Sequence, residues 1–180
     1  MWHVFKRRAF EQQVLVHMDS LYRYAYSLTG NREDAEDLVQ ETMLKAYDAF
    51  GRLKKGSNVK AWLFTILRNT FLNSKRGTGK PGFFVHTELS GFAGGEDPSR
   101  IVQLRLDADA VREVIEQLPE EFRTPLVLCD VEGFSYKEIS EIMNCPVGTV
   151  MSRLYRARRQ VRKALTQHTN IRLKEQGDEV

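Results

Sequence analysis

The chain contains little of what metal sites, disulfide frameworks and membrane spans require. It has two cysteines and four histidines in 180 residues, and none stands at a metal-ligand spacing. Cys129 and Cys145 are too far apart for a disulfide framework or a zinc site, so we expect both to be small buried residues. No apolar run approaches the roughly 20 residues of a membrane span, and the N-terminus lacks an apolar signal-peptide core. These absences predict a cytoplasmic protein with no metal and no membrane insertion.

Catalytic patterns are missing as well. The chain has no glycine-rich phosphate loop and no nucleophile set beside a base. We therefore expect a binding protein without a cofactor, and not an enzyme. Its apolar share of 42% and charged share of 28% are those of a globular protein of one or two small domains. The net charge is only +3, so affinity for nucleic acid has to come from local clusters of cations.

One such cluster lies in the stretch Gly133–Lys163, which predicts two helices joined by a tight turn. Ser135 and Glu138 form an S-x-x-E capping box that fixes the start of the first helix. Asn144 and Pro146 interrupt the helical pattern. A second helix follows, and its apolar residues recur at three- and four-residue spacing: Val147, Val150, Leu154, Val161 and Leu165.

The opposite face of this second helix is basic. Projection at about 100° per residue places the following residues there, with Arg153 on a flank: Ser152, Tyr155, Arg156, Arg159 and Lys163. From Met151 to Lys163 the chain has six cations and no acid. An arginine row also fits an ordinary solvated helix. The capped first helix and the short turn favour a helix-turn-helix that places its second helix in the DNA major groove.

The predicted helix Arg32–Phe50, capped by Asn31, has the opposite character. Its expected core face comprises Ala35, Val39, Thr42, Ala46 and Phe50. From Asn31 to Asp48 there are six acids and two bases, a local net charge of −4. The solvent side is expected to carry Asp37, Glu41, Leu44 and Asp48, with Gln40 and Tyr47 at its edge. This acidic ridge predicts a docking surface for a basic protein, and an acidic solvated face is the alternative.

A third helix, predicted over 59–76 and capped by Asn58, is apolar almost all round. We interpret Trp62, Leu63 and Ile66 mainly as core residues. Aromatic rings between amides and cations also suit unstacked bases, and this hypothesis applies above all to the polar residues Asn69, Asn73, Lys75 and Arg76.

The remaining segments complete the predicted organisation. A first helix is expected over Phe10–Thr29, ended by Gly30. Six of the twelve glycines lie in 77–99, which predicts a flexible linker. Ser99 is expected to cap the next helix, Pro119 to start another, and Pro125 to bend or shorten it. The sequence thus predicts an all-α chain: helical domains at 1–77 and 100–168, a linker at 78–99, and a fraying polar tail at 169–180.

Four strings in this order resemble the extracytoplasmic function (group IV) sigma factors of bacterial RNA polymerase. D-A-E-D-L-V-Q-E-T at Asp34–Thr42 resembles the polymerase-binding helix of that family, and A-W-L-F-T-I-L-R-N-T at Ala61–Thr70 its minus-10 helix. L-P-E-E-F-R at Leu118–Arg123, G-F-S-Y-K-E-I and C-P-V-G-T-V-M-S-R-L-Y-R-A-R resemble its minus-35 domain. The resemblance covers nearly the whole chain apart from the linker and the ends, and it implies an alternative sigma factor.

The resemblance also implies partners and site residues. Core RNA polymerase would be bound through the clamp helices of its largest subunit and the flap of the second largest. The implied polymerase contacts are Asp37, Gln40 and Glu41, extended by Leu44 and Tyr47. The implied contacts to the melted minus-10 strand are Trp62, Arg68, Asn69, Asn73, Lys75 and Arg76. Those to the minus-35 duplex are Thr149, Ser152, Arg153, Tyr155, Arg156 and Arg159.

The sequence departs from the family pattern at two positions, which limits the family properties that can be transferred to this chain. Met151 stands where relatives often have a basic or polar residue, and Pro125 where they have a good helix former. Family members are commonly restrained by an anti-sigma factor, which is therefore an expected partner. The alternative reading is a helix-turn-helix regulator that dimerises through its N-terminal half. It leaves the acidic ridge and the aromatic-amide helix unexplained, and a gel shift with and without core polymerase would separate the two.

Overall fold

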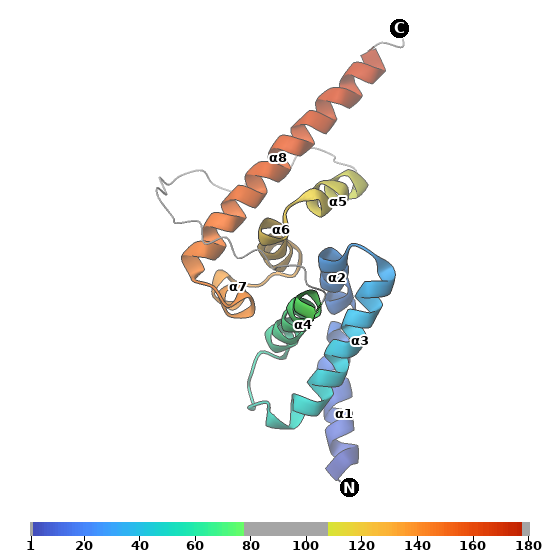
Figure 1. Ribbon diagram of the computed structural model, residues 1–180, viewed down its shortest axis with the longest axis vertical. Coiled ribbons are helices and arrows are strands. Elements are labelled where there is room, and N and C mark those ends of the chain that lie inside the picture. The colour runs from blue at the N-terminus through green and yellow to red at the C-terminus, as the bar shows by residue number, and fades with distance from the viewer. Residues whose placement is uncertain (1, 78–107, 178–180) are drawn as a thin grey trace.

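The computed structural model describes residues 2–77 and 108–177, and within these residues the chain forms helices and no strand (Figure 1). The prediction of an all-α fold is confirmed. The predicted linker at 78–99, the Ser99 cap and the last three residues lie outside the described part of the chain.

The N-terminal half contains α1 (Trp2–Val14), α2 (Met18–Thr29), α3 (Arg32–Ala49) and α4 (Val59–Gly77). The single helix predicted over Phe10–Thr29 is wrong, because a 3₁₀ turn at Leu15–His17 separates α1 from α2. The break contains no glycine or proline, and the apolar periodicity of the sequence continues through it. The sequence pattern therefore did not reveal it. Gly30 ends α2 as predicted: its φ of +77° is left-handed, and its N–H donates to the Tyr26 carbonyl at 2.8 Å.

Asparagine caps start the next two helices, as the sequence predicts. The Asn31 side chain accepts a hydrogen bond from the Asp34 N–H at 2.9 Å at the start of α3. Asn58 does the same for the Ala61 N–H at 3.0 Å at the start of α4. Each cap satisfies a backbone donor that has no partner within its own helix.

The C-terminal half contains α5 (Ala108–Gln117), α6 (Glu120–Leu126), α7 (Tyr136–Met143) and α8 (Val147–Gly177). Pro125 lies inside α6, and the chain widens directly after it into a π turn, Val127–Val131. A proline has no N–H to donate, so a disturbance of the helix near Pro125 is the expected consequence. Ser135 and Glu138 form the predicted capping box, with hydrogen bonds of 2.8 and 3.3 Å.

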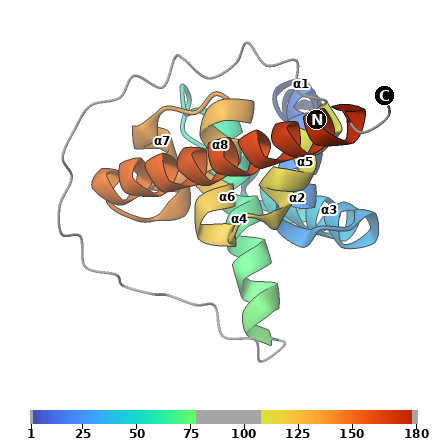
Figure 2. The ribbon, with the colours of Figure 1, turned by 90° about the horizontal axis from the view of Figure 1, so that it is seen from above.

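Asn144 ends α7 with a left-handed φ of 49°, and α8, the second helix of the helix-turn-helix, begins at Val147. α8 packs against α5, α6 and α7 and lies across them when seen from above (Figure 2). Val150, Leu154 and Leu165 are buried on its inner face, as the periodicity predicts. The helix continues to Gly177, so the segment expected to fray from residue 169 is largely helical.

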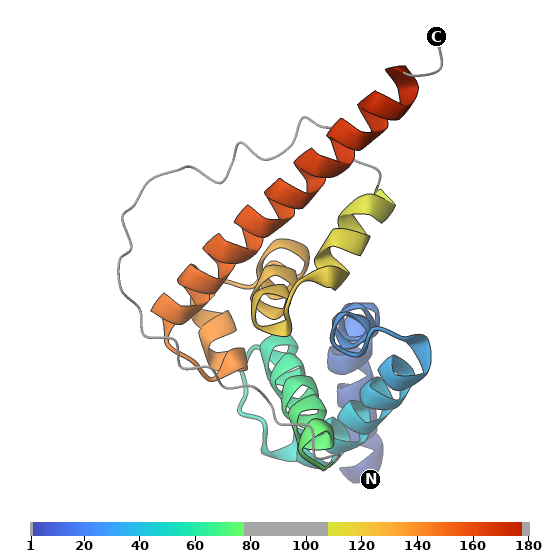
Figure 3. The ribbon, with the colours of Figure 1, turned by 45° about the horizontal axis from the view of Figure 1, so that its top comes forward.

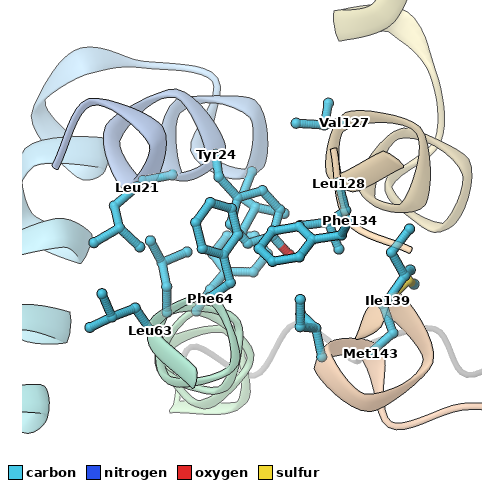
Figure 4. Close-up of a cluster of buried hydrophobic side chains, with 14 of the residues drawn as sticks. Leu21, Tyr24, Leu63, Phe64, Val127, Leu128, Phe134, Ile139 and Met143 are labelled. Carbon is cyan, nitrogen blue, oxygen red and sulfur yellow. The ribbon is translucent and has the colours of Figure 1, made fainter. Parts of the chain in front are cut away.

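The two halves share one hydrophobic core. Tyr24 of α2 stacks on Phe64 of α4 with ring centroids 5.1 Å apart, and Phe64 meets Phe134 edge-on at 4.9 Å. Figure 4 shows these rings between Leu63 on one side and Leu128 on the other. Tyr24, Leu63, Phe64 and Leu128 are completely buried. Burying each such side chain is worth about 1.5–3 kcal/mol, so this cluster contributes strongly to holding the halves together.

Polar contacts surround this shared core. The Glu132 carboxylate, 1% exposed, accepts hydrogen bonds from Arg23 of α2 at 3.0 and 3.1 Å and lies 3.2 Å from Lys60 Nζ of α4. Lys60 Nζ also donates to the Glu132 main-chain carbonyl at 2.7 Å. At the edge, the Asn58 amide donates to the Glu138 carboxylate at 2.6 Å. The N-terminal caps of α4 and α7 are thus bonded to each other across the two halves.

Candidate partner and nucleic-acid interfaces

The acidic ridge predicted from the sequence lies exposed along α3. Asp37, Gln40, Glu41 and Leu44 are exposed, and 63% of the Leu44 surface is exposed to solvent. Glu41 forms an i,i+4 ion pair of 2.6 Å with Lys45, and this pair is about half exposed. A surface pair of this kind is worth well under 1 kcal/mol. Glu41 can therefore exchange Lys45 for a cation of a partner at little cost.

Tyr47 differs from the rest of the ridge, because it is half-buried. Its ring packs edge-on against Phe10 of α1 at 5.1 Å. It therefore fixes α1 against α3 and offers only part of its surface to a partner. Ala35, Val39, Thr42 and Ala46 are buried on the opposite face, as predicted, while the Phe50 ring is partly buried.

A groove of about 550 Å³ runs beside the ridge between α2 and α3. Apolar side chains line most of it: Met18, Tyr22, Val39 and Met43. Asp19, Glu36 and Gln40 complete the lining, so Gln40 belongs to both the groove and the ridge. Sequence reasoning missed this groove because its walls come from two helices. The only local signal was that two of its lining residues, Met18 and Met43, are methionines, and that Met43 follows the acidic stretch of α3.

The third predicted surface lies on α4, which packs against α2 and α3 on one side and α7 on the other (Figure 3). This placement explains why α4 is apolar almost all round. Leu63 is buried, and Trp62 and Ile66 are half-buried against the core, as we expected. Phe64 and Phe71 are also buried, so neither ring is available for stacking on a base.

The polar residues of α4 that the sequence singled out occupy different environments. Asn69 and Asn73 are exposed one turn apart, and Arg68 is half-buried. Lys75 Nζ lies 2.7 Å from the Glu120 carboxylate and 4.4 Å from the centroid of the Phe71 ring. Arg76 lies within α4, and its side chain is outside the described part of the structure.

The predicted DNA face of α8 is only partly as projected. Tyr155, Arg156 and Arg159 are exposed, and Thr149 is half-buried. Ser152 was projected to face solvent, yet only 7% of it is exposed. Its hydroxyl donates to the Thr149 carbonyl at 3.0 Å, so this short side chain folds back on its own helix.

Two arginines of α8 are held by acids of the same half. Arg153 lies 3.8 Å from Glu121 of α6, with 25% of its side chain exposed. Arg158 bonds both carboxylate oxygens of Asp130, at 2.6 and 3.1 Å, and reaches Tyr136 Oη at 3.5 Å. The hydrogen bonds that Arg158 donates to Asp130 raise the Arg158 pKa above its ordinary value. Arg158 therefore fastens α8 to the π turn, and the basic row contains fewer DNA-facing cations than its composition indicates.

Neither cysteine is part of a metal site in the described residues, where no group of three or more potential ligands occurs. Cys129 and Cys145 are half-buried free thiols rather than fully buried residues, and burial raises the pKa of both. Across residues 2–77 and 108–177, no helix is both long and apolar enough to span a bilayer.

The comparisons with known proteins agree with this arrangement. Residues 14–80 match the family "Sigma-70 region 2", and residues 108–161 match "Sigma-70, region 4". The chain is 37% identical over 165 residues to the ECF RNA polymerase sigma factor SigE of Mycolicibacterium smegmatis, which covers 90% of this chain and 63% of SigE. It is 38% identical over 169 residues to the RNA polymerase sigma-H factor of Pseudomonas aeruginosa, covering 88% of this chain and 87% of that protein.

A solved structure shows the same fold. The sigma factor RpoE in complex with the anti-sigma factor NepR, from Bartonella quintana, aligns with a TM-score of 0.70 and 33% identity. The alignment covers 88% of this chain and 98% of RpoE. Sigma factors are transcription initiation factors and not catalysts. On the strength of both domain matches and of these relatives, the chain belongs to the extracytoplasmic function (ECF) sigma factors, the alternative sigma factors that direct promoter recognition and transcription initiation.

Proposed function

We propose that the chain binds core RNA polymerase through α3, captures the melted minus-10 strand on α4, and anchors the minus-35 duplex with α8. In this proposal residues 1–77 form the polymerase and minus-10 domain, residues 100–168 form the minus-35 domain, and 78–99 join them. Initiation takes place on the chromosome, so the protein would work in the cytoplasm and associate with the nucleoid when bound to polymerase.

The observation that carries the proposal is the separation of charge between two exposed helices. The ridge on α3 is acidic and carries the exposed Leu44, which suits a basic protein surface and repels DNA. The outer face of α8 carries Arg156 and Arg159 and suits DNA phosphates. We assign the clamp helices of the largest polymerase subunit to the α3 ridge and its groove. The flap of the second-largest subunit we assign to the C-terminal half.

The minus-10 assignment depends on Asn69 and Asn73, which present two exposed amides one turn apart on α4. Amides are suited to hydrogen-bonding the edges of unstacked bases. Unstacking a base costs a few kcal/mol, and a prepared binding surface offsets part of that cost. Lys75 is paired with Glu120 in this structure, with side chains 39% and 36% exposed. Since such an exposed pair is worth at most about 1 kcal/mol, a phosphate can replace Glu120.

An anti-sigma factor is the expected regulator. RpoE of Bartonella quintana, which shares 33% identity with this chain, is solved bound to NepR. We propose a partner of the same kind here. In this proposal, any zinc in such a complex would be bound by the partner.

The test of the proposal is Glu41→Lys on α3. It reverses the charge at the centre of the ridge, and like charges across an interface cost several kcal/mol. We expect affinity for core polymerase to fall at least about tenfold, or about 1.4 kcal/mol, in a pull-down or anisotropy titration. Glu116→Lys, the same change at an exposed position of α5, is the control. Circular dichroism should show both variants folded. Equal affinity of Glu41→Lys and wild type would contradict the assignment of α3.

A further inference from the structure

Three exposed apolar side chains follow one line along the start of α8. Val147, Met151 and Tyr155 keep 40%, 46% and 55% of their surfaces exposed. They are spaced i, i+4 and i+8, so each lies about one turn above the last and is rotated by about 40°, and the three form one row that winds slowly round the helix. We call these three residues the apolar stripe. The apolar periodicity of the sequence places Val147 in the core, and the structure places it on this outer line instead.

The same line continues into cations. Arg159 follows Tyr155 by four residues, Lys163 follows Arg159 by four, and both are exposed. Each step of four residues turns the row by about 40°, so the row winds round α8, with apolar side chains near the start of the helix and basic side chains further along. An acidic side chain is absent from the sequence between Met151 and Lys163. This combination favours duplex DNA over a protein as the occupant, because a continuous row of cations complements phosphates.

The order of the two segments matches the way a helix-turn-helix meets DNA. The N-terminal residues of its second helix contact base edges, while phosphates are contacted by cations at the margins. The apolar stripe belongs to the N-terminal part and would therefore lie near the base edges of a bound duplex. In the major groove, the one apolar group that distinguishes a base pair is the C5-methyl of thymine. Apolar side chains in this position gain free energy at thymine and at no other base.

We propose that Met151, central in the apolar stripe, is a specificity-determining residue that selects thymine in the minus-35 element through contact with its methyl group. The inference rests on the proposed function, in which α8 binds the minus-35 duplex. The unbranched Met151 side chain can follow the surface of a methyl group. Val147 and Tyr155 flank the contact and exclude water from it. Arg159 holds the helix on the DNA backbone and contributes to affinity for every sequence.

The experiment uses the full chain reconstituted with core RNA polymerase. A promoter library randomised over the minus-35 region is first enriched for duplexes that the complex binds. Each thymine of the enriched element is then replaced, one at a time, by deoxyuridine, which removes only the methyl group. Binding is measured for wild type, Met151→Ala, Met151→Leu and, as a control at an exposed position elsewhere on α8, Gln160→Ala.

At one thymine, deoxyuridine should weaken binding by wild type about fourfold, the value of one buried methyl-sized group. Met151→Leu and Gln160→Ala should keep this penalty, and Met151→Ala should reduce it to less than about 1.5-fold. An enriched element in which no thymine is sensitive overturns the inference alone. So does a penalty that Met151→Ala leaves unchanged, which would assign the methyl contact to another residue. A library with no enrichment upstream overturns the proposed function itself.

Discussion

Glu132 joins the two halves of the chain, and we expect its replacement by glutamine to loosen that junction. The carboxylate comes from the segment after the π turn, and its two cationic partners come from α2 and α4. Glu132→Gln keeps the shape of the side chain and one acceptor oxygen but removes the negative charge. Arg23 and Lys60 would then face a neutral group at the boundary of the shared core.

The size of the effect follows from the exposure of the partners. Removing one member of a fully buried pair costs about 3–5 kcal/mol, because the other charge is left unpaired in the interior. Here the Glu132 side chain is 1% exposed, but Arg23 is 52% and Lys60 27% exposed. Both cations can therefore turn toward water. We expect a loss of about 2 kcal/mol, within the range for hydrogen bonds to charged groups.

The assay is urea denaturation followed by circular dichroism, which gives the free energy of unfolding of wild type and variant. Small-angle X-ray scattering at zero urea reports whether the halves separate before either unfolds. Glu141→Gln, at an exposed position of α7, removes the same charge and is the matched control. The double variant with Arg23→Gln completes a cycle, in which we expect a coupling energy of at least about 1 kcal/mol.

Two results would refute this reasoning. The first is that Glu132→Gln lowers the free energy of unfolding by less than about 0.5 kcal/mol, the usual scale for surface substitutions, and by no more than the control Glu141→Gln does. The second is strict additivity with Arg23→Gln. The first would show that apolar contacts alone, such as Phe64 on Phe134, keep the halves together, and the second that Arg23 does not contribute to the junction.

Three further predictions concern the helix-turn-helix. Ser135→Ala should lower the free energy of unfolding by about 1 kcal/mol. Hydrogen bonds donated by Ser135 lower the Glu138 pKa below its ordinary 4.5. The loss of stability should therefore be full above pH 4.5 and should shrink as acid protonates Glu138 in the folded state. A loss that stays constant into acid would contradict the capping box. Arg158→Met should lower the midpoint of thermal unfolding, because Asp130 loses a bidentate partner, and an unchanged midpoint would show that this pair does not hold α8. Arg156→Ala should weaken minus-35 binding by about 1–3 kcal/mol at specific base pairs; an equal, salt-dependent loss on all sequences would assign Arg156 to phosphate.

Local chemistry made much of the fold predictable. Gly30, Asn31 and Ser135 act through hydrogen bonds to residues at most four positions away, so their effect is visible in the sequence. The exposed ridge on α3 was predictable because one face of a helix repeats every three or four residues. The break between α1 and α2 was not predictable, because the 3₁₀ turn at 15–17 contains neither glycine nor proline.

The position of each helix against its neighbours lay beyond local reasoning. A helical projection shows which residues share a face, but not how wide an arc the neighbouring helices cover. For this reason Ser152 and Val147 were assigned to the wrong environments, and the groove beside Val39 and Gln40 was missed. The all-round apolar character of α4 was visible in the sequence. Its cause, packing of α7 against its second side, was not.

The sequence alone thus determined the helices, their caps, the charge of their faces and the family. Each of these depends on residues within a few positions of one another or on continuous strings. Tertiary structure alone decided that the two halves share a core around Phe64 and Phe134 and that Glu132 joins them. It also decided which arginines of α8 face outward and which, like Arg158, hold the fold. These features bring together side chains up to 109 residues apart, and only the packing of complete helices sets such contacts.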